Sequence, residues 1–216
     1  MSMTIRNPLL QTSQKRDSNR QVKGERVELF SLVNSTNFEH SQTVSQISRL
    51  MADKAGFSEN EREVIAQAGL CHDVGKAAIP VDILDKPSSL TPAEYEVVKT
   101  HTAAGHAQIT KTIESLSIAA IVALQHHEHI DGLGYGHLAG ADIHPYAKLV
   151  AVADVFDALY SRRSYKEPWD VERIKEYFAQ RAGRQFDKGA VSLLFSILGD
   201  VLPLYGGQRT ERRRSQ

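Results

Sequence analysis

The sequence predicts an all-α protein. Apolar residues recur at helical spacing, as in Val44, Ile47, Leu50 and Met51, which form one stripe of an amphipathic helix. Helix-capping signals precede several apolar runs, and no segment of useful length shows the alternation of apolar and polar residues that is typical of a strand. With 41% hydrophobic residues in a chain of 216, one domain can bury a substantial core.

Two of the predicted helices begin with a capping box. Ser58 is followed three residues later by Glu61, at the start of a helix that we expect to run toward Gly75. The segment Thr91 to Glu94 has an N-cap threonine, a proline in the first turn and a glutamate at the third helical position. Both patterns place a helix start within one or two residues.

The second half of the chain continues as helices around one loop. Residues 118–125 are nearly all apolar, which predicts a helix buried on all sides, and residues 131–140 are rich in glycine, which predicts a loop. A proline then opens a long apolar helix over 145–160. Two more helices are expected near 170–182 and 187–200, and they complete the folded body.

The charge distribution separates this body from the two ends. Lys and Arg number 26, as do Asp and Glu, and the zero net charge argues against general nucleic-acid binding. Residues 1–26 carry a net charge of +4 and residues 207–216 one of +3, so the rest of the chain carries −7. We therefore expect a disordered basic segment at 1–26, a folded domain at 27–200 and an Arg-rich, disordered tail at 201–216.

Composition also bounds the location of the protein and the type of metal site. The most apolar stretch, 116–124, is about half the roughly 20 residues that a bilayer requires, and no secretory signal begins the chain. We therefore expect a cytoplasmic protein. A single cysteine, Cys71, excludes an internal disulfide and a thiolate zinc site. The chain has nine histidines, so any bound metal would be held by nitrogen and oxygen ligands.

Histidines and acidic residues gather at the ends of predicted helices, as His72-Asp73 and His126-His127-Glu128. Asp154 lies within an apolar helix, where a carboxylate is costly unless a cation pairs with it. Each feature alone has an ordinary explanation, such as a hydrogen-bonded core histidine or a solvated helix end. Together they favour one metal centre, because adjacent helical residues point about 100° apart and can reach different sides of a metal cluster. Histidine and carboxylate ligands suit iron, manganese or zinc.

These residues resemble the HD-GYP phosphodiesterases, a branch of the HD metal-dependent phosphohydrolase superfamily. The resemblance covers roughly residues 27–200, and it is carried by His40, HDVGK (72–76), His101 with Gly105, HHEHIDGLGYG (126–136) and ADVFDALYSRRSYK (153–166). It implies an HD-domain helical bundle with a binuclear metal site in its core.

The resemblance also implies the ligands of two divalent transition-metal ions. One ion would be held by His40, His72, Asp73 and Asp154. The other would be held by Asp73, His101, His126 and His127, so that Asp73 bridges the pair. Iron or manganese is expected first, and zinc, nickel or cobalt would also fit.

The implied reaction is hydrolysis of cyclic di-GMP, a bacterial second messenger, to pGpG and, in some members, to GMP. A hydroxide between two metals about 3.5–4 Å apart would attack phosphorus, with Asp73 and Lys76 as catalytic residues. The implied substrate contacts are Lys76, Tyr135, Asp157, Arg163 and Lys166. The Gly-rich loop is also a candidate contact for protein partners.

Three departures from the family pattern bear on these expectations. Gly136 stands where the family has proline, so we expect a more mobile loop. Thr36 stands where some members have a glutamate that holds a third metal, which favours two metals here. His129 occupies a position that is often basic. The remaining histidines are expected on the surface or in loops: His106, His137 and His144.

Two other functions remain open from the sequence. One is a related HD phosphohydrolase that acts on another cyclic dinucleotide or on a nucleotide. The other is a catalytically weak module that senses nucleotide or redox state. Arg163 and Lys166 favour the cyclic di-GMP enzyme, whereas Gly136 and the lack of a clear sensor or output domain keep the sensing module open. The sequence leaves open the oligomeric state, and whether the chain acts alone or belongs to a longer regulator.

Overall fold

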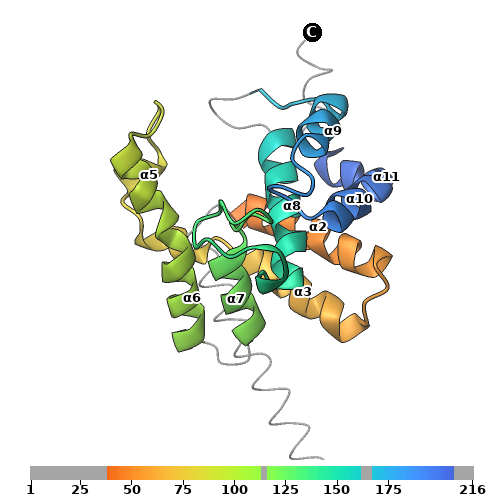
Figure 1. Cartoon of the computed structure of the whole chain (residues 1–216), viewed down its shortest axis with the longest axis horizontal. Helices are drawn as coiled ribbons and strands as arrows, with labels where there is room; N and C mark the ends of the chain where they lie inside the picture. The colour runs from red at the N-terminus through yellow and green to blue at the C-terminus, as the bar shows by residue number, and fades with distance from the viewer. Residues whose placement is uncertain (1–37, 113–115, 162–166, 207–216) are drawn as a thin grey trace, which may run out of the picture.

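The computed structural model describes residues 38–112, 116–161 and 167–206, and within these ranges it contains helices and loops but no strand (Figure 1). The predicted all-α class is confirmed. The α-helices are α2 (Phe38–Lys54), α3 (Glu59–Cys71), α4 (Val81–Leu84), α5 (Pro92–Lys99), α6 (His101–Thr112), α7 (Ser117–Gln125), α8 (Pro145–Tyr160), α9 (Val171–Ala179), α10 (Lys188–Ser196) and α11 (Leu198–Val201). The described residues also form short 3₁₀ helices at η1 (Val74–Ala78), η3 (Gly140–Asp142) and η4 (Leu202–Tyr205), the last of which follows α11.

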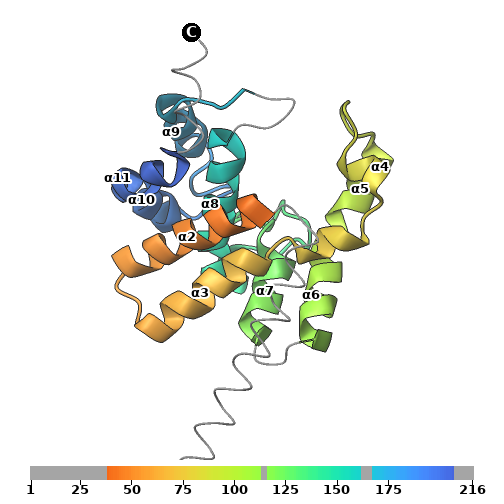
Figure 2. The same cartoon turned by 180° about the vertical axis from the view of Figure 1, so that it is seen from behind.

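Helix α8 is the centre of the bundle (Figure 1). The hairpin of α2 and α3 packs against it, α7 touches both α3 and α8, and α6 lies beside α7. Helices α9 and α10 also contact α8, and Figure 2 shows them with α11 near the α2 end of the hairpin. Helices from three separate parts of the described chain, α2 with α3, α7, and α9 with α10, therefore contact α8.

The expected helix starts are confirmed by their hydrogen bonds. At α3, the Ser58 N–H donates to the Glu61 carboxylate at 2.8 Å, while the Ser58 side chain accepts from the Glu61 N–H. Thr91 and Glu94 make the same reciprocal pair at α5. Helix α8 begins at its proline as predicted, and His144 caps it by accepting the Tyr146 N–H at 3.2 Å. These bonds satisfy N–H groups that have no partner within a helix.

The core side chains of α8 explain its central position. Val150, Val152, Ala153 and Phe156 are fully buried. Each large apolar side chain contributes about 1.5–3 kcal/mol when it is removed from water. Asp154 lies in the middle of this run and is 8% exposed, so its carboxylate needs partners from the neighbouring helices.

One of the expected helices differs from the structure in its burial. Helix α7 is buried on one side only, with Leu124 36% exposed, because α3, α6 and α8 leave its other side uncovered. Helix α3 ends at Cys71, where the chain turns into η1, so that His72 and Asp73 follow the helix end as expected. That turn places His72 and Asp73 at a helix end, where their side chains can face the bundle interior.

Helical structure continues past the expected boundary at residue 200. Helices α11 and η4 continue to Tyr205, and Val201 and Tyr205 are both buried. The first residues of the expected tail therefore belong to the core, where the Tyr205 ring packs against Phe156 and Tyr160 of α8. Among the described residues, no single helix is long and apolar enough to cross a membrane. The pair Lys188–Ser196 and Leu198–Tyr205, bent by 61°, meets the length and composition test only when taken together.

The packing of η1 against α6 leaves no space for a side chain at Gly75. A Cβ there would lie 1.9 Å from the His101 carbonyl oxygen and 2.4 Å from the Gly105 nitrogen. This close approach brings the backbone next to Asp73 up against the first turn of α6. The glycine is therefore required by backbone proximity.

We expect Gly75→Ala to lower the free energy of unfolding by about 1–3 kcal/mol, because overpacking at this point must push two backbone segments apart. Urea denaturation measures the change. Gly199→Ala is the matched control: a Cβ on Gly199 would have no neighbour within 4 Å. Alanine there should be neutral or stabilise α11 by about 0.5–1 kcal/mol. Equal stability of the two variants would contradict the packing argument.

Candidate metal centre

Five histidines and two aspartates gather in one cluster around Asp73. They come from α2, the end of α3, the start of α6, the end of α7 and the middle of α8. The members are His40, His72, Asp73, His101, His126, His127 and Asp154. They form three overlapping groups, in each of which the candidate ligand atoms lie within 4.8 Å of one another. The structure thus brings together all seven residues expected from the sequence.

Asp73 lies between two sets of histidines. Its Oδ1 is 3.3 Å from His101 Nε2 and 3.7 Å from His126 Nε2. Its Oδ2 is 3.3 Å from His72 Nε2 and 3.8 Å from His40 Nε2. The two oxygens of one carboxylate therefore face different histidine pairs, which is the arrangement that a bridging ligand requires.

The two remaining members extend these sets. Asp154 Oδ1 lies 3.1 Å from His40 Nε2 and 3.7 Å from His72 Nε2, on the Oδ2 side of Asp73. The ring centroid of His127 lies 4.1 Å from that of His126, on the Oδ1 side. Each side of Asp73 thus holds three further potential ligands.

The ring orientation of three histidines is set by backbone carbonyls. The Nδ1 atoms of His72, His101 and His126 lie 2.7, 2.7 and 2.9 Å from the carbonyl oxygen three residues earlier. A carbonyl oxygen only accepts, so each Nδ1 carries a proton and each Nε2 points into the cluster. His72 and His126 directly follow α3 and α7, where the last carbonyls have no partner within the helix.

Two buried atoms in the cluster make no hydrogen bond. They are His72 Nε2 and Asp73 Oδ1, both closed off from solvent. A buried polar atom without a partner costs about 1–3 kcal/mol. A cation next to these atoms would remove that cost, and a donor set of imidazole nitrogens and carboxylate oxygens suits divalent transition metals. The residues therefore fit a metal on the basis of this geometry.

Without a metal, a proton on His72 supplies positive charge next to the buried carboxylates. Burial alone would lower the pKa of His72, but the Asp73 and Asp154 carboxylates outweigh it and raise that pKa to about 10. Burial would raise the pKa of Asp73, yet His72 and Lys76 hold it well below its usual value. Burial lowers the pKa of His126 to about 4 and also lowers that of His127. A metal would have to displace the His72 proton.

Asp157 contacts the cluster through the Nδ1 atom of His40, on the side of the ring away from Asp73. Its Oδ2 lies 2.5 Å from His40 Nδ1, and its Oδ1 accepts hydrogen bonds of 2.8 Å from Ser161 Oγ and from the Tyr205 hydroxyl. Asp157 is only 2% exposed. A buried carboxylate with these partners does not face a substrate, which corrects the expected substrate contact. Asp157 instead orients the His40 ring.

Lys76 and Tyr135 lie at the edge of the cluster. Lys76 Nζ pairs with Asp73 Oδ2, and the Tyr135 ring lies 4.6 Å from the His127 ring. The Tyr135 hydroxyl is 3.4 Å from that of Tyr95, with Lys99 Nζ 5.8 Å from both ring centroids. Tyr95 and Lys99 did not stand out in the sequence. The expected contacts Arg163 and Lys166, and the position of Thr36, lie outside the described residues.

The Gly-rich loop is fastened to a buried carboxylate. Glu128 accepts hydrogen bonds from the Gly136 N–H at 2.5 Å and from the Leu138 N–H at 3.0 Å. A proline at position 136 would have no N–H to donate. The glycine therefore makes a bond that the family's proline cannot make, and this bond opposes the mobility expected from the sequence. Sequence reasoning treated Glu128 as a helix-end residue and missed this role.

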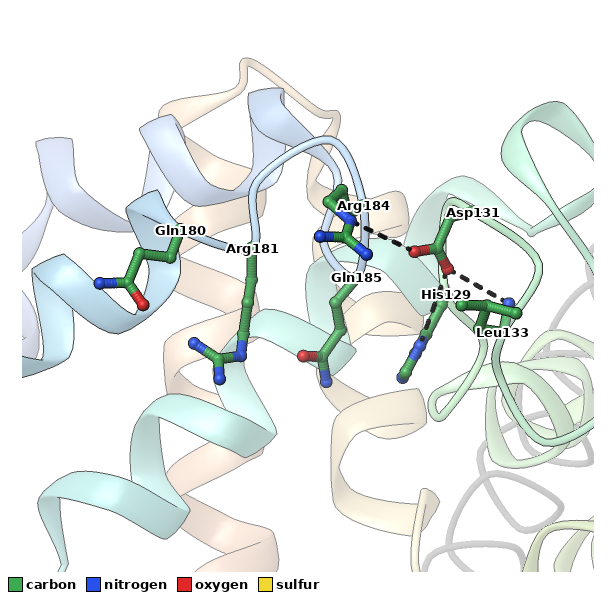
Figure 3. A pocket seen from close by; sticks show the side chains of 7 residues that line it. All are labelled: His129, Asp131, Leu133, Gln180, Arg181, Arg184 and Gln185. Carbon is green, nitrogen blue, oxygen red and sulfur yellow. Dashed lines mark hydrogen bonds and ion pairs between the residues drawn. The ribbon is translucent and has the colours of Figure 1, made fainter.

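A pocket of 430 Å³ lies on the other side of the same loop (Figure 3). It is lined by His129, Asp131, Leu133, Gln180, Arg181, Arg184 and Gln185. The Asp131 N–H donates to the Arg184 carbonyl at 2.8 Å, which joins the loop to the turn after α9. The pocket shares no residue with the histidine cluster, so it is a separate feature of the surface.

Comparison with known proteins agrees with this geometry. The chain is 41% identical over 155 residues to the cyclic di-GMP phosphodiesterase response regulator RpfG of Xanthomonas campestris, covering 71% of this chain and 41% of RpfG. It is 40% identical over 157 residues to 3'3'-cGAMP-specific phosphodiesterase 2 of Vibrio cholerae, covering 72% and 30%. It is 34% identical over 174 residues to the cyclic di-GMP phosphodiesterase of Thermotoga maritima, covering 80% and 47%. The chain thus spans less than half of each of these relatives.

Solved structures agree on the fold. Bd1817 of Bdellovibrio bacteriovorus, described as an HDG"Y"P protein, matches with a TM-score of 0.63 at 24% identity over 76% of this chain and 53% of its own. The HD domain of Listeria monocytogenes PgpH, solved with cyclic-di-AMP, matches with a TM-score of 0.57 at 16% identity over 83% and 97%. The family model described as HD domain matches residues 27–189. With the His72-Asp73 pair at the centre of its helical bundle, the chain belongs to the HD domain family.

Proposed function

We propose that this chain is a metal-dependent phosphodiesterase of the HD-GYP type that hydrolyses cyclic di-GMP. One observation carries the proposal: a buried carboxylate, Asp73, presents its two oxygens to two separate histidine sets. Such a centre suits the cleavage of a phosphodiester. RpfG and the Thermotoga protein are both named cyclic di-GMP phosphodiesterases, which supports this substrate. We propose linear pGpG as the product, with GMP as a further product.

The proposed ligand sets follow the two sides of Asp73. His40, His72, Asp73 and Asp154 would hold one divalent ion, and Asp73, His101, His126 and His127 would hold the other. When bound, two such ions supply Lewis-acid polarisation of the phosphodiester and of the attacking water. Iron or manganese is proposed first, since both accept mixed nitrogen and oxygen ligands.

The chain's own residues would bind and orient the substrate. Lys76 is partly exposed beside Asp73, so its ammonium is placed to pair with a non-bridging phosphate oxygen once a cation occupies the carboxylate. Tyr135 lines the edge of the cluster next to His127 and would flank the entering nucleotide. Arg163 and Lys166 follow α8 in the sequence and are proposed to contact the guanine and phosphate groups.

A second candidate substrate is 3'3'-cGAMP. The chain is nearly as similar to the cGAMP-specific Vibrio enzyme, at 40% identity, as it is to RpfG, at 41%. Both substrates contain two phosphodiester links, and they differ in one base. The cluster around Asp73 would act on either of them, so base contacts must decide between the two.

Purified protein with Mn²⁺ or Fe²⁺ should convert cyclic di-GMP to pGpG, as measured by chromatography. Asp73→Asn should lower kcat/KM more than about 100-fold, because an NH2 group replaces one of the two bridging oxygens and the negative charge is lost, which removes several kcal/mol of transition-state stabilisation. Asp82→Asn, an identical change on the exposed surface of α4, should leave the rate unchanged. Tight nucleotide binding without turnover in any metal would favour the sensing module instead.

The same preparation should favour cyclic di-GMP over 3'3'-cGAMP by about tenfold or more in kcat/KM, which corresponds to about 1.4 kcal/mol of differential binding. Competition between the two substrates in one reaction measures the ratio directly. A ratio of one tenth or less would make 3'3'-cGAMP the preferred substrate and overturn the proposed specificity.

Removing the metal should destabilise the protein, because it removes the cation between the buried Asp73 and Asp154 carboxylates. At free metal near 100 times the dissociation constant, binding adds about 2.7 kcal/mol to stability. Thermal unfolding with and without a chelator measures the difference, and elemental analysis should find two ions per chain. A content of one ion per chain would contradict the binuclear assignment.

A further inference from the structure

The last described turn of the chain reaches the candidate metal centre through one hydroxyl. Tyr205 ends η4 and is 3% exposed, and its hydroxyl donates to Asp157 Oδ1 at 2.8 Å. The HD domain match ends at residue 189, so this contact comes from a segment that the family model does not include. The sequence had placed the same residues in a disordered tail.

His40 needs support that three of the other cluster histidines obtain from the backbone. Its Nδ1 bonds to Asp157 Oδ2 at 2.5 Å, whereas His72, His101 and His126 bond to carbonyl oxygens of their own segments. A side-chain carboxylate can rotate, and a backbone carbonyl at a helix end cannot. The direction of His40 Nε2, which lies 3.1 Å from Asp154 Oδ1, therefore depends on what holds Asp157.

Tyr205 is itself held firmly. Its ring packs edge-on against Tyr160 with a centroid distance of 4.7 Å and contacts Phe156 at 6.4 Å. Val201, one turn earlier, is fully buried. Burial, reinforced by the Asp157 carboxylate, raises the pKa of Tyr205, so its hydroxyl remains a donor. Ser161 Oγ donates to the same oxygen at 2.8 Å and provides partial support.

We propose that Tyr205 is a positioning residue for the metal centre. It fixes Asp157, which in turn fixes the His40 ring, so that the C-terminal turn completes the side of the centre formed by His40, His72 and Asp154. This inference rests on the ligand role of His40 in the proposed function. Partners of this kind typically change metal affinity by 10–100-fold when they are removed. Because Ser161 remains, we expect an effect at the lower end of that range.

The test compares metal affinity in Tyr205→Phe and in the wild type, with Mn²⁺ as the probe and a fluorescent chelator as the competitor. We expect one of the two ions to bind about tenfold more weakly and the other to bind as before. Tyr146→Phe is the matched control, since it removes a tyrosine hydroxyl on α8 that donates to the Glu61 carboxylate at 3.3 Å, away from the cluster. Its affinity for both ions should equal that of the wild type.

A second comparison separates positioning from packing. In a His40→Ala background, Tyr205→Phe should cause no further loss of Mn²⁺ affinity, because the ring that it orients is gone. A lower melting temperature of the metal-free Tyr205→Phe protein with unchanged Mn²⁺ affinity would show a purely structural role and overturn the inference. An equal loss in both backgrounds would also overturn it.

Neither comparison requires turnover, so this inference and the proposed function can be refuted independently. Wild-type protein that binds two Mn²⁺ ions and hydrolyses neither dinucleotide would refute the function alone. Full hydrolysis with unchanged Mn²⁺ affinity in Tyr205→Phe would refute the positioning role alone.

Discussion

The hydrogen bonds that fix the Nδ1 atoms of the cluster histidines are the constraint on which the rest of the site depends. Three rings are tied to carbonyl oxygens of their own segments and a fourth to Asp157. These bonds leave the Nε2 atoms pointing toward one carboxylate, Asp73. Helix ends are well suited to this task, because their last carbonyls are unsatisfied and can accept a side-chain proton without breaking the helix. The hydrogen bonds therefore orient the candidate ligand nitrogens in the absence of a metal.

Helix α8 holds one of these histidines from both sides. Asp154 and Asp157 are three residues apart and share a helix face. One carboxylate lies at His40 Nε2 and the other at His40 Nδ1. The fully buried apolar residues of α8 fix the helix in the bundle, so the packing energy of the core also positions the charged groups. Stability and function are coupled here, because a shift of α8 would move both carboxylates relative to His40.

Close backbone approach and buried acceptors decide how the surrounding segments meet. Gly75 lets η1 lie against α6, which brings Asp73 and His101 together. Next to His101, Glu128 anchors the Gly-rich loop through two N–H groups and keeps Tyr135 next to His127. Both contacts use backbone atoms of the η1 turn or the loop, so the neighbouring histidine side chains remain available to coordinate a metal. The loop departs from the family pattern at Gly136, yet it is anchored by the bond that this residue makes possible.

The sequence by itself determined the helical class, the starts of α3, α5 and α8, the HD family and the seven residues of the cluster. These are local properties: caps, periodicity and short motifs depend on neighbours within a few positions. Only the tertiary structure decided that Asp157 faces His40 instead of a substrate, that Glu128 holds the loop, and that Tyr205 is buried beside Asp157. His40 and Asp157 are 117 positions apart in the sequence, and Asp157 and Tyr205 are 48 positions apart. A local pattern cannot predict these contacts, because whether a carboxylate turns inward or outward depends on which distant donor the packed core brings beside it.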